Sequence, residues 1–292
     1  MERALWKCIV HALRRLPRRR RRNAHYLDHQ ILAVFFWAAL HDRPVSWACR
    51  RENWPPQAWR RVLPDQSTMS RRLRHPGMRE QLIAALRILQ RHHGVSTQLV
   101  VDGKALPVSE YTTDVDARTG WGAGRYMKGY KLHLLIDSAW RVLAWRVRPM
   151  NEAEPVVAGD LLRDAAAARM LPDDGVVLGD SAYDSNPLHA IAAAHGVQLV
   201  APPKTSAGGG GHRRHHPGRL CSLRRTKGRS ARRRWGRRRG TIERYFGALA
   251  SVGGGLAALP SWVRREHRTD LWVGAKLVIH AARISRERCL AA

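Results

Sequence analysis

Two aspartates each follow a short apolar run of the sequence. Asp102 comes directly after Leu99–Val101, and Asp180 follows Val176–Leu178 with one glycine between them. Such runs predict buried strands, so each carboxylate is expected at the rim of a sheet. Taken singly, each aspartate is better explained as a strand-end residue that bonds its own backbone. Taken together, two neighbouring carboxylates would repel each other unless a cation lies between them.

Magnesium would suit such a pair of carboxylates. It prefers oxygen ligands and binds through one or two protein carboxylates, while phosphate oxygens of a substrate complete its shell. Two such ions support in-line attack of water or a 3'-hydroxyl on a phosphodiester bond. The two aspartates therefore indicate a metal-dependent site that cuts or joins nucleic acid strands.

Glu243 is the third acidic residue of interest. It is the first acidic residue after Asp184, and arginines accumulate in the interval between them. A helix here would place Arg239 and Glu243 on one face, four residues apart, with Ile242, Phe246 and Leu249 on the buried side. The alternative to a catalytic role for Glu243 is a simple helical ion pair.

The charge of the chain indicates a polyanionic partner. Its 292 residues carry 52 Lys and Arg against 23 Asp and Glu, a formal net charge of +29. Self-repulsion on this scale is tolerated mainly when nucleic acid is the working partner. An anionic membrane surface is the rival partner, but the basic residues are spread along the chain rather than confined to one helix.

The cysteines and the apolar run near the N-terminus indicate the cellular compartment in which the protein is expected. Cys8, Cys49, Cys221 and Cys289 show no CxxC pairing, which argues against a zinc site and fits a reducing cytoplasm. The run Ile31–Leu40 is far shorter than the roughly 20 residues of a membrane span. We expect a buried helix there, and a cytoplasmic protein associated with the nucleoid.

Residues 1–95 are expected to form a helical domain. Asp65 or Ser67 is placed to cap a short helix that would expose Ser70, Arg71 and Arg72. A helix-turn-helix-like DNA-binding domain is one interpretation, with Arg71 and Arg72 contacting DNA. A helical packing domain with a basic surface accounts for the same residues equally well.

Residues 96–292 change to a mixed pattern of strands and helices. Three strands are predicted first, followed by a helix, a strand, a helix and a strand, which gives an α/β fold whose mixed sheet is flanked by helices. The predicted strands cover Leu99–Val101, Lys131–Asp137, Val142–Val147, Val176–Leu178 and Val197–Val200, and the helices cover Pro155–Ala168 and Pro187–Ala194.

A Gly- and Arg-rich insertion occupies about residues 204–240. Four consecutive glycines, Gly208 to Gly211, disfavour regular structure, and the arginines that follow repel one another. We expect this insertion to be disordered unless it lies on phosphate. Helices are expected after it, over Thr241–Ala248 and Asp270–Ser285.

Four motifs together resemble the insertion-sequence transposases that carry a DDE triad. They are VVDGKAL around Asp102, YMKGYKLHLLID from Tyr126 to Asp137, LGDSAYDS around Asp180, and RGTIERYFGAL around Glu243. The resemblance runs from the QSTMSRRLR stretch of the helical domain to the last helix and so covers most of the chain. It implies a ribonuclease-H-like fold for the catalytic domain of residues 96–292.

The resemblance also implies an activity. Asp102, Asp180 and Glu243 would be catalytic and would hold two Mg²⁺ ions, with Mn²⁺ able to substitute. The protein would cleave transposon ends and join them to target DNA by hydrolysis and transesterification, as a homo-oligomer on double-stranded DNA. Two alternatives remain: a transposase-derived DNA-binding protein that no longer cuts, and a nuclease on the same fold.

Six further residues near these motifs are expected to contact DNA. Lys131 and His133 share one side of a strand, because side chains alternate along it, while Lys128 is expected in the preceding loop. The competing interpretations are a solvated Lys128 and a Tyr183 ring packed on the following helix. Arg239 and Arg244 flank the glutamate and would bind phosphates next to the scissile bond.

Two positions depart from the related enzymes. Many of those carry an aspartate where this chain has Glu154, and a lysine where this chain has Ala250. The first change keeps a carboxylate. The second removes a basic residue from the helix of Glu243, and so is the feature of the sequence that favours a protein that binds DNA without cutting it.

Overall fold

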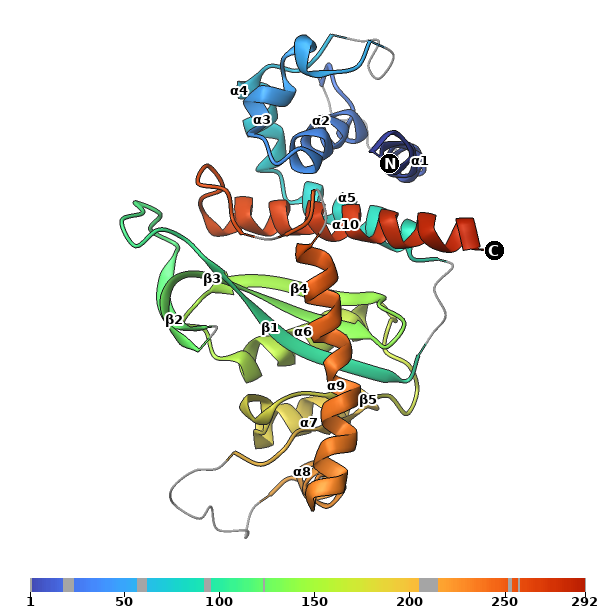
Figure 1. Cartoon of the computed structure of the whole chain (residues 1–292), viewed down its shortest axis with the longest axis vertical. Coiled ribbons are helices and arrows are strands. Elements are labelled where there is room, and N and C mark those ends of the chain that lie inside the picture. Colours follow the sequence, from blue (N-terminus) through green and yellow to red (C-terminus); the bar gives the residue numbers. More distant parts are fainter. Residues whose placement is uncertain are drawn as a thin grey trace. The chain divides into compact units, whose positions relative to one another are not determined.

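The computed structural model describes residues 2–17, 24–56, 62–91, 96–122, 124–204, 215–251, 254–256 and 258–291. The chain forms two compact units, Met1–His92 with Leu249–Ala292, and His93–Ala248. The first unit is helical and the second contains the sheet (Figure 1). No described helix is both long and apolar enough to cross a membrane.

The helical unit is built around a helix that is apolar on all sides. The run Ile31–Leu40 lies within α2 (Asp28–Leu40), in which almost every side chain is buried. The sequence-based prediction of a buried helix is therefore confirmed. The other helices of this unit are α1 (Glu2–Arg14), α3 (Val45–Ala48), η1 (Arg51–Asn53), α4 (Gln66–Leu73), α5 (Gly77–Leu89) and α10 (Glu266–Ala291).

The helix α10 packs with the helical unit, although the sequence predicts a single domain over residues 96–292. It contacts α5, α1 and α2. Lys276 of α10 is 1% exposed, and its Nζ donates to the Ala39 carbonyl and to Asp42 Oδ1, both at 2.5 Å. This ammonium therefore binds a carbonyl near the end of α2 and ties helices that are far apart in the sequence.

The short helix α4 is capped as the sequence predicts. Asp65 Oδ1 accepts a hydrogen bond from the Thr68 amide at 2.7 Å, and the cap lowers the pKa of Asp65. The helix exposes Arg71, but Arg72 is turned inward. Its guanidinium lies 2.5 Å from Asp28 Oδ1 and donates to the Tyr26 carbonyl at 2.7 Å. Arg72 thus stabilises the helical unit and does not offer its charge to DNA.

The second unit contains a mixed sheet with β1 near its middle. The strands are β1 (Gln98–Pro107), β2 (Arg118–Gly122), β3 (Arg125–Asp137), β4 (Val142–Pro149), β5 (Val176–Leu178) and β6 (Gln198–Val200). Their order is β2-β3-β1-β5-β6, and β4 also pairs with β3. Pairs among β1 to β4 are antiparallel, whereas β1, β5 and β6 are parallel. This is the ribonuclease-H-like arrangement that the resemblance implied.

Two details of the sheet differ from the predictions. The strand β2 was not predicted, because three of the residues in Arg118–Gly122 and its turn are glycines at Gly120, Gly122 and Gly124. Lys128 lies inside β3 and not in a loop, since β3 begins at Arg125 and extends past the sheet core to pair with β2.

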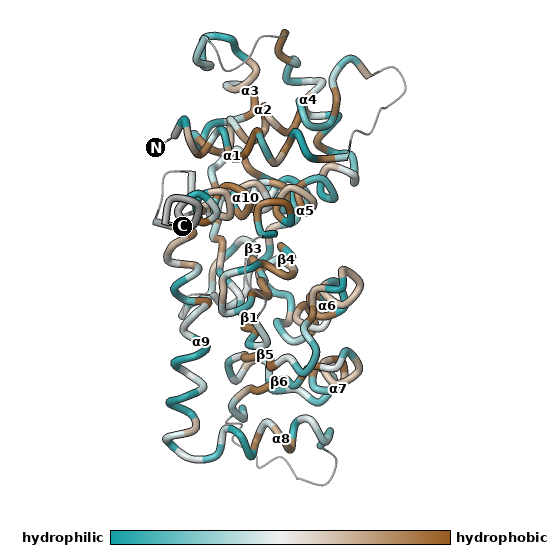
Figure 2. The backbone as a smooth tube through the Cα atoms, turned by 90° about the vertical axis from the view of Figure 1, so that its right-hand side faces the viewer, coloured by the Kyte–Doolittle hydropathy of each residue, from teal (hydrophilic) through white to brown (hydrophobic). Residues whose placement is uncertain are grey.

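The two faces of the sheet are covered by different helices. Leu99, Val101 and Leu135 pack in one core cluster with residues of α6 (Glu154–Ala167) and α7 (Asn186–Ala194). Asp102 points to the opposite face, where α9 (Arg229–Ala250) reaches it through Arg239. Figure 2 shows α9 on one side of the sheet and α6 and α7 on the other.

The basic segment is helical where the structure describes it, so the prediction of disorder is wrong there. It forms α8 (Pro217–Arg225) and α9, whereas Gly208 to Gly211 fall outside the described residues. Arginine is a good helix former, and the charges find neighbours. The guanidinium groups of Arg234 and Arg238 lie 5.9 and 5.0 Å from the Trp235 ring centroid, and the Trp235 indole donates to the Arg225 carbonyl at 2.8 Å.

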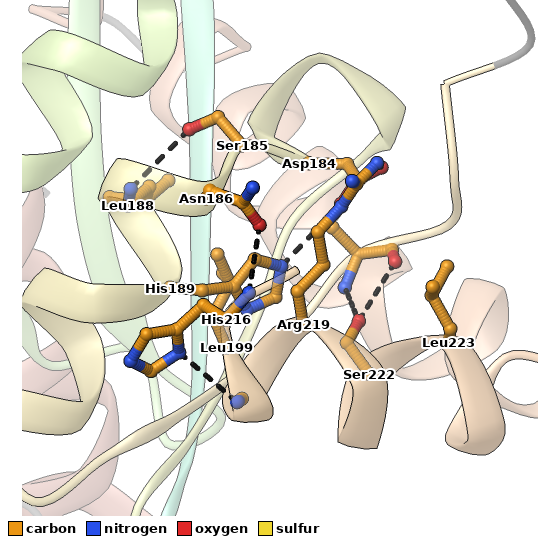
Figure 3. A network of polar contacts seen from close by, with 12 residues as sticks. Asp184, Ser185, Asn186, Leu188, His189, Leu199, His216, Arg219, Ser222 and Leu223 are labelled. Atoms are coloured by element: carbon orange, nitrogen blue, oxygen red, sulfur yellow. Dashed lines mark hydrogen bonds and ion pairs between the residues drawn. The ribbon is translucent and has the colours of Figure 1, made fainter. Parts of the chain in front are cut away.

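A buried ion pair fixes α8 to the segment that follows Asp180. Asp184, just after η2 (Ser181–Tyr183), has a fully buried side chain that accepts two hydrogen bonds from Arg219 of α8, each at 2.7 Å (Figure 3). His189 Nε2 lies 3.5 Å from the same carboxylate. Despite its burial, the hydrogen bonds from Arg219 hold the pKa of Asp184 well below its usual range. The pair therefore anchors one end of the loop that carries Asp180.

Replacing Asp184 with Asn should destabilise the protein at neutral pH by about 3 kcal/mol, because it leaves the Arg219 charge without its buried partner. The stabilisation depends on a carboxylate with a depressed pKa, so it is fully present above the unfolded pKa of about 4 and is lost as the pH falls further. Urea denaturation of wild type and D184N at several pH values measures both effects. D173N, at an exposed aspartate, is the matched control, and equal unfolding free energies for the two variants would contradict this prediction.

Candidate active site

The topology of the sheet brings Asp102 and Asp180 to the same edge. The parallel pairing of β1 and β5 ends with Val100 opposite Leu178, and each aspartate lies two residues further on. The carboxyl ends of adjacent parallel strands meet at one edge of a sheet. Asp180 therefore follows the end of β5 as predicted, whereas Asp102, predicted to end its strand, lies inside β1, which continues beyond β5 to pair with β3 as far as Pro107.

The contacts of Asp102 and Asp180 agree with both roles considered for them, that of a residue that bonds its own backbone and that of a metal ligand. Asp102 Oδ1 accepts a hydrogen bond from the Gly103 amide at 2.8 Å, and Asp180 Oδ1 accepts one from the Ala182 amide at 2.7 Å. Each carboxylate thus bonds the backbone of its own segment. These bonds also fix the direction of each carboxylate, as a ligand site requires.

Asp102 lies in an electrostatically unfavourable place for a negative charge. Burial raises the pKa of its carboxyl to about 6, against the lowering effects of the Gly103 amide and of Arg239. The carboxylates of Asp180 and Glu154 raise the pKa further. The group therefore sits among other acidic side chains and gains from any added positive charge.

The helix α9 delivers Glu243 to the same side of the sheet. Ile242 and Tyr245 are buried, and the Tyr245 ring packs edge to face with Trp140 at 5.7 Å. Phe246, which we expected to be buried, is half-buried and lies under the Lys104 ammonium at 6.0 Å. The buried stripe leaves Glu243 on the other face of the helix, where its side chain is 57% exposed.

Arg239 joins two of the three carboxylates. Its guanidinium lies 3.1 Å from Asp102 Oδ2 and also forms an ion pair with Glu243 one helical turn away. Among the residues that the structure describes, no three His, Cys, Asp or Glu side chains form a group that could hold a metal ion. Asp102 and Glu243 are therefore linked through an arginine and do not converge with Asp180 as one ligand set.

The residues present nevertheless suit a divalent cation. The donors are carboxylate oxygens, which hard ions such as Mg²⁺ prefer. Asp102 gains from a positive charge, and the guanidinium of Arg239 supplies one in this structure. Arg239 is therefore the counter-charge of the acidic site in this structure, and its contact with a DNA phosphate stays a prediction.

Tyr183 is packed inside the protein. Its side chain is 0% exposed and its hydroxyl has no hydrogen-bond partner among the described residues. Burial raises its pKa well above the ordinary value, and the carboxylates of Glu154, Asp102 and Asp180 add to this effect. Its ring lies against Gly179, where an added Cβ would be 3.0 Å from the ring. Tyr183 therefore supports the Asp180 loop from behind and is not placed to touch DNA.

Lys131 and His133 are also buried, on the face of β3 opposite to Asp102. Lys131 Nζ lies 2.6 Å from Glu154 Oε1 at the start of α6. Burial and the nearby charges of Lys131 and Arg148 lower the pKa of His133 to about 3, so its ring is neutral. Neither side chain is available to DNA. The Lys131–Glu154 pair lies on the side of the sheet opposite to Asp102. The only sign of it in the sequence was Glu154, the acidic residue at the position where related enzymes carry an aspartate.

Of the remaining predicted DNA contacts, Arg71 and Arg244 are exposed. Their side chains lie near Thr68 Oγ1 and Thr241 Oγ1, at 3.3 and 3.1 Å. Lys128 is half-buried and donates to the Thr112 carbonyl at 3.2 Å. Contact of these three side chains with DNA stays a prediction.

Comparison with known proteins identifies the class of protein to which this site belongs. The family model for the transposase DDE domain matches residues 93–271. Among solved structures, the chain is similar to the piggyBac transposase in its synaptic complex with hairpin DNA, with a TM-score of 0.53 and 10% sequence identity over 99% of this chain and 72% of that chain. No curated protein matches the sequence.

The chain therefore belongs to the transposase DDE domain family. Membership makes it a transposase, with DNA as the molecule on which it acts, and its family uses divalent metal ions. The similarity to the piggyBac transposase concerns the fold.

Replacing Arg239 with Gln should destabilise the protein mainly where Asp102 is ionised, because the other partner of Arg239, Glu243, has a side chain that is 57% exposed and screened by solvent. Since the pKa of Asp102 is about 6, the loss should be small at pH 5 and reach on the order of 1 kcal/mol at pH 8, as expected for a partly exposed ion pair. Unfolding free energies measured across this range test the prediction. Arg238, exposed on the same helix, gives the control R238Q, and a loss that is independent of pH would contradict the pairing.

Proposed function

We propose that this protein is an active DNA transposase in which Asp102, Asp180 and Glu243 hold two Mg²⁺ ions, for which Mn²⁺ substitutes. The observation that carries the proposal is the placement of Asp102 and Asp180 at one edge of the sheet, with the Glu243 helix on the side to which Asp102 points. When bound, the ions would activate an attacking hydroxyl and neutralise charge at the scissile phosphate.

The residues of this chain would prepare the site in three ways. The amides of Gly103 and Ala182 orient the two aspartates. Tyr183, packed on Gly179, excludes water from behind the Asp180 loop. Arg239 holds Asp102 and Glu243 in place until a cation takes over their charge, after which its fork would be available to a DNA phosphate. The products would be cut transposon ends and, with a 3'-hydroxyl as the nucleophile, joined strands.

A DNA-binding protein that no longer cuts is the second candidate. It is favoured by Arg239, whose guanidinium lies between Asp102 and Glu243 and pairs with both, and by Ala250 in place of a basic residue. Under this proposal the exposed arginines would remain useful while the carboxylates would be structural.

Cleavage of DNA that carries the sequences flanking the gene distinguishes the two candidates. In the presence of Mn²⁺, the active enzyme should nick this DNA, and D102N and D180N should each reduce the rate by more than about 100-fold, beyond the loss typical of residues that only support a metal ligand. D160N, on the α6 side of the sheet, should cut at the wild-type rate. Wild-type protein that binds but never nicks would instead support the second candidate.

The arginines of α8 and α9 supply the non-specific affinity in either case. Nine basic residues between 224 and 238 are exposed, and no acidic residue lies between Asp184 and Glu243. Each phosphate that such a side chain neutralises releases a counterion and steepens the dependence of binding on salt. These residues are Arg224, Arg225, Lys227, Arg229, Arg232, Arg233, Arg234, Arg237 and Arg238.

Glutamine at Arg232, Arg233 and Arg237 together should therefore reduce the slope of log affinity against log salt by about 2–3, close to 0.9 for each lost phosphate contact. Fluorescence anisotropy with duplex DNA at several salt concentrations measures the slope. Glutamine at Arg3, Arg14 and Arg15, which are exposed in or beside α1, changes the net charge equally. An equal reduction of the slope in both triple variants would show that only net charge matters.

A further inference from the structure

The hairpin of β2 and β3 exposes two aromatic rings that the fold does not use. Trp121 is 58% and Tyr126 is 73% exposed, and they form a direct cross-strand pair. Their ring centroids are 5.3 Å apart in an edge-to-face arrangement with an interplanar angle of 81°. We call the paired parts of this hairpin, residues 118–122 and 125–129, the aromatic ribbon. Figure 1 shows it at the end of the sheet away from β5.

Close packing on the inner face of the aromatic ribbon leaves no room there for these rings. Gly120 lies so close to the chain at Met150 that an added Cβ would be 2.4 Å from the Met150 carbonyl oxygen. A Cβ at Gly122 would be 2.9 Å from Ala105 Cβ, and Met127 is buried. Because side chains alternate along a strand, Trp121 and Tyr126 must then lie on the outer face. Their exposure is thus built into the register of the hairpin.

The outer face of the aromatic ribbon lies on the same side of β3 as Asp102. Asp102 pairs with Leu134 of β3, and Tyr126 is an even number of residues from Leu134 on that strand, so Asp102 and Tyr126 share a face. The separation of eight residues corresponds to about 26 Å along the strand. Between them, the connection from β1 covers Tyr130, whose hydroxyl donates to Asp114 Oδ2 at 2.7 Å.

The charge of the aromatic ribbon suits an anionic partner. Between residues 118 and 128 it has three basic residues, Arg118, Arg125 and Lys128, and no acidic one. Lys128 shares the face of Tyr126, two residues away on β3, whereas Arg118 and Arg125 are exposed on the opposite face of the hairpin. The acidic residues nearby belong to the preceding connection, where Asp114 is buried, Asp116 is half-buried and Glu110 is exposed. Exposed aromatic rings on a basic hairpin match the combination that binds nucleic acid strands through their bases and phosphates.

We propose that the outer face of the aromatic ribbon binds unpaired bases of a DNA strand, with Trp121 and Tyr126 as stacking surfaces and Lys128, on the same face, beside the phosphates. This inference rests on the proposed function, because it gives the DNA that reaches the carboxylates a second point of attachment. The spacing places that contact about 26 Å, or roughly 8 nucleotides, from the bond that is cut.

Binding of three DNA probes of the same sequence tests the proposal: a single strand, a duplex with a short unpaired stretch, and a fully paired duplex. W121A and Y126A should each weaken binding to the first two probes by at least about 5-fold, the lower end of the loss of one base stack. W121F should retain most of the affinity, whereas W121L, which keeps an apolar side chain, should lose it. The matched control is V156A, at a side chain that is 66% exposed on α6, and it should bind as the wild type does.

A crosslink adds a measurement of position. Iodouracil placed roughly 8 nucleotides from the cut bond should crosslink to Trp121 or Tyr126 on illumination, and a base placed next to the cut bond should not. Wild-type affinity in both W121A and Y126A would overturn the proposal, and so would an equal loss on paired and unpaired DNA. A change in self-association without a change in DNA affinity would also overturn it, since the face would then be a protein interface.

The cleavage and binding measurements test the catalytic carboxylates and the aromatic ribbon separately. Unchanged cleavage by D102N would reject the catalytic assignment and leave the binding results intact. Normal cleavage by the wild type together with unaffected binding by W121A and Y126A would reject only the role of the aromatic ribbon. Wild-type protein that binds none of the three probes would reject both.

Discussion

The pairing of β1 with β3 on one side and with β5 on the other is the constraint on which the catalytic unit depends. The antiparallel pairing fixes which residues of β1 face α9, and the parallel pairing places the end of β5 beside Val100, two residues before Asp102. A slip of one residue in either ladder would turn Asp102 towards α6 or separate it from Asp180. The buried residues Leu99 and Val101 prevent that slip, because they must face the core. The geometry of the acidic site is thus a by-product of core packing.

Two carboxylates of this strongly basic protein, Asp184 and Asp102, differ in how fully nearby positive charge compensates them. The Asp184 side chain is fully buried and that of Asp102 is 18% exposed. Asp184 receives two hydrogen bonds from Arg219 and has a depressed pKa, whereas Asp102 has one longer contact with Arg239 and a raised pKa. The difference separates a structural carboxylate from one that is left partly unsatisfied. Such incomplete compensation is typical of functional sites. It agrees with the assignment of Asp184 to the scaffold and of Asp102 to the chemistry.

Much of this architecture could be predicted from local sequence. Leu99–Val101 and Val176–Leu178 are short apolar runs followed by polar residues. Their lengths and apolar character predicted two buried strands, and Asp102 and Asp180 were expected next to them. The glycines of β2 hid a strand, because they are needed for close packing on Met150 rather than for a turn. Charge counting gave the wrong state for Arg229–Arg239, since it ignored helix propensity and stacking on Trp235. The inward turn of Arg72 depends on Asp28, 44 residues away, a contact that local sequence patterns do not show.

The continuity of α9 has a consequence for how this protein tolerates change. One uninterrupted helix carries the exposed arginines, the Arg239 bridge and Glu243. Each residue of a helix turns its neighbours by about 100°. Loss or gain of a single residue between Arg229 and Arg238 would swing the arginines before it around the axis relative to Glu243, although composition and charge would hardly alter. Substitutions in this helix should therefore be accepted more readily than insertions or deletions, and its length is as much a part of the site as its charges.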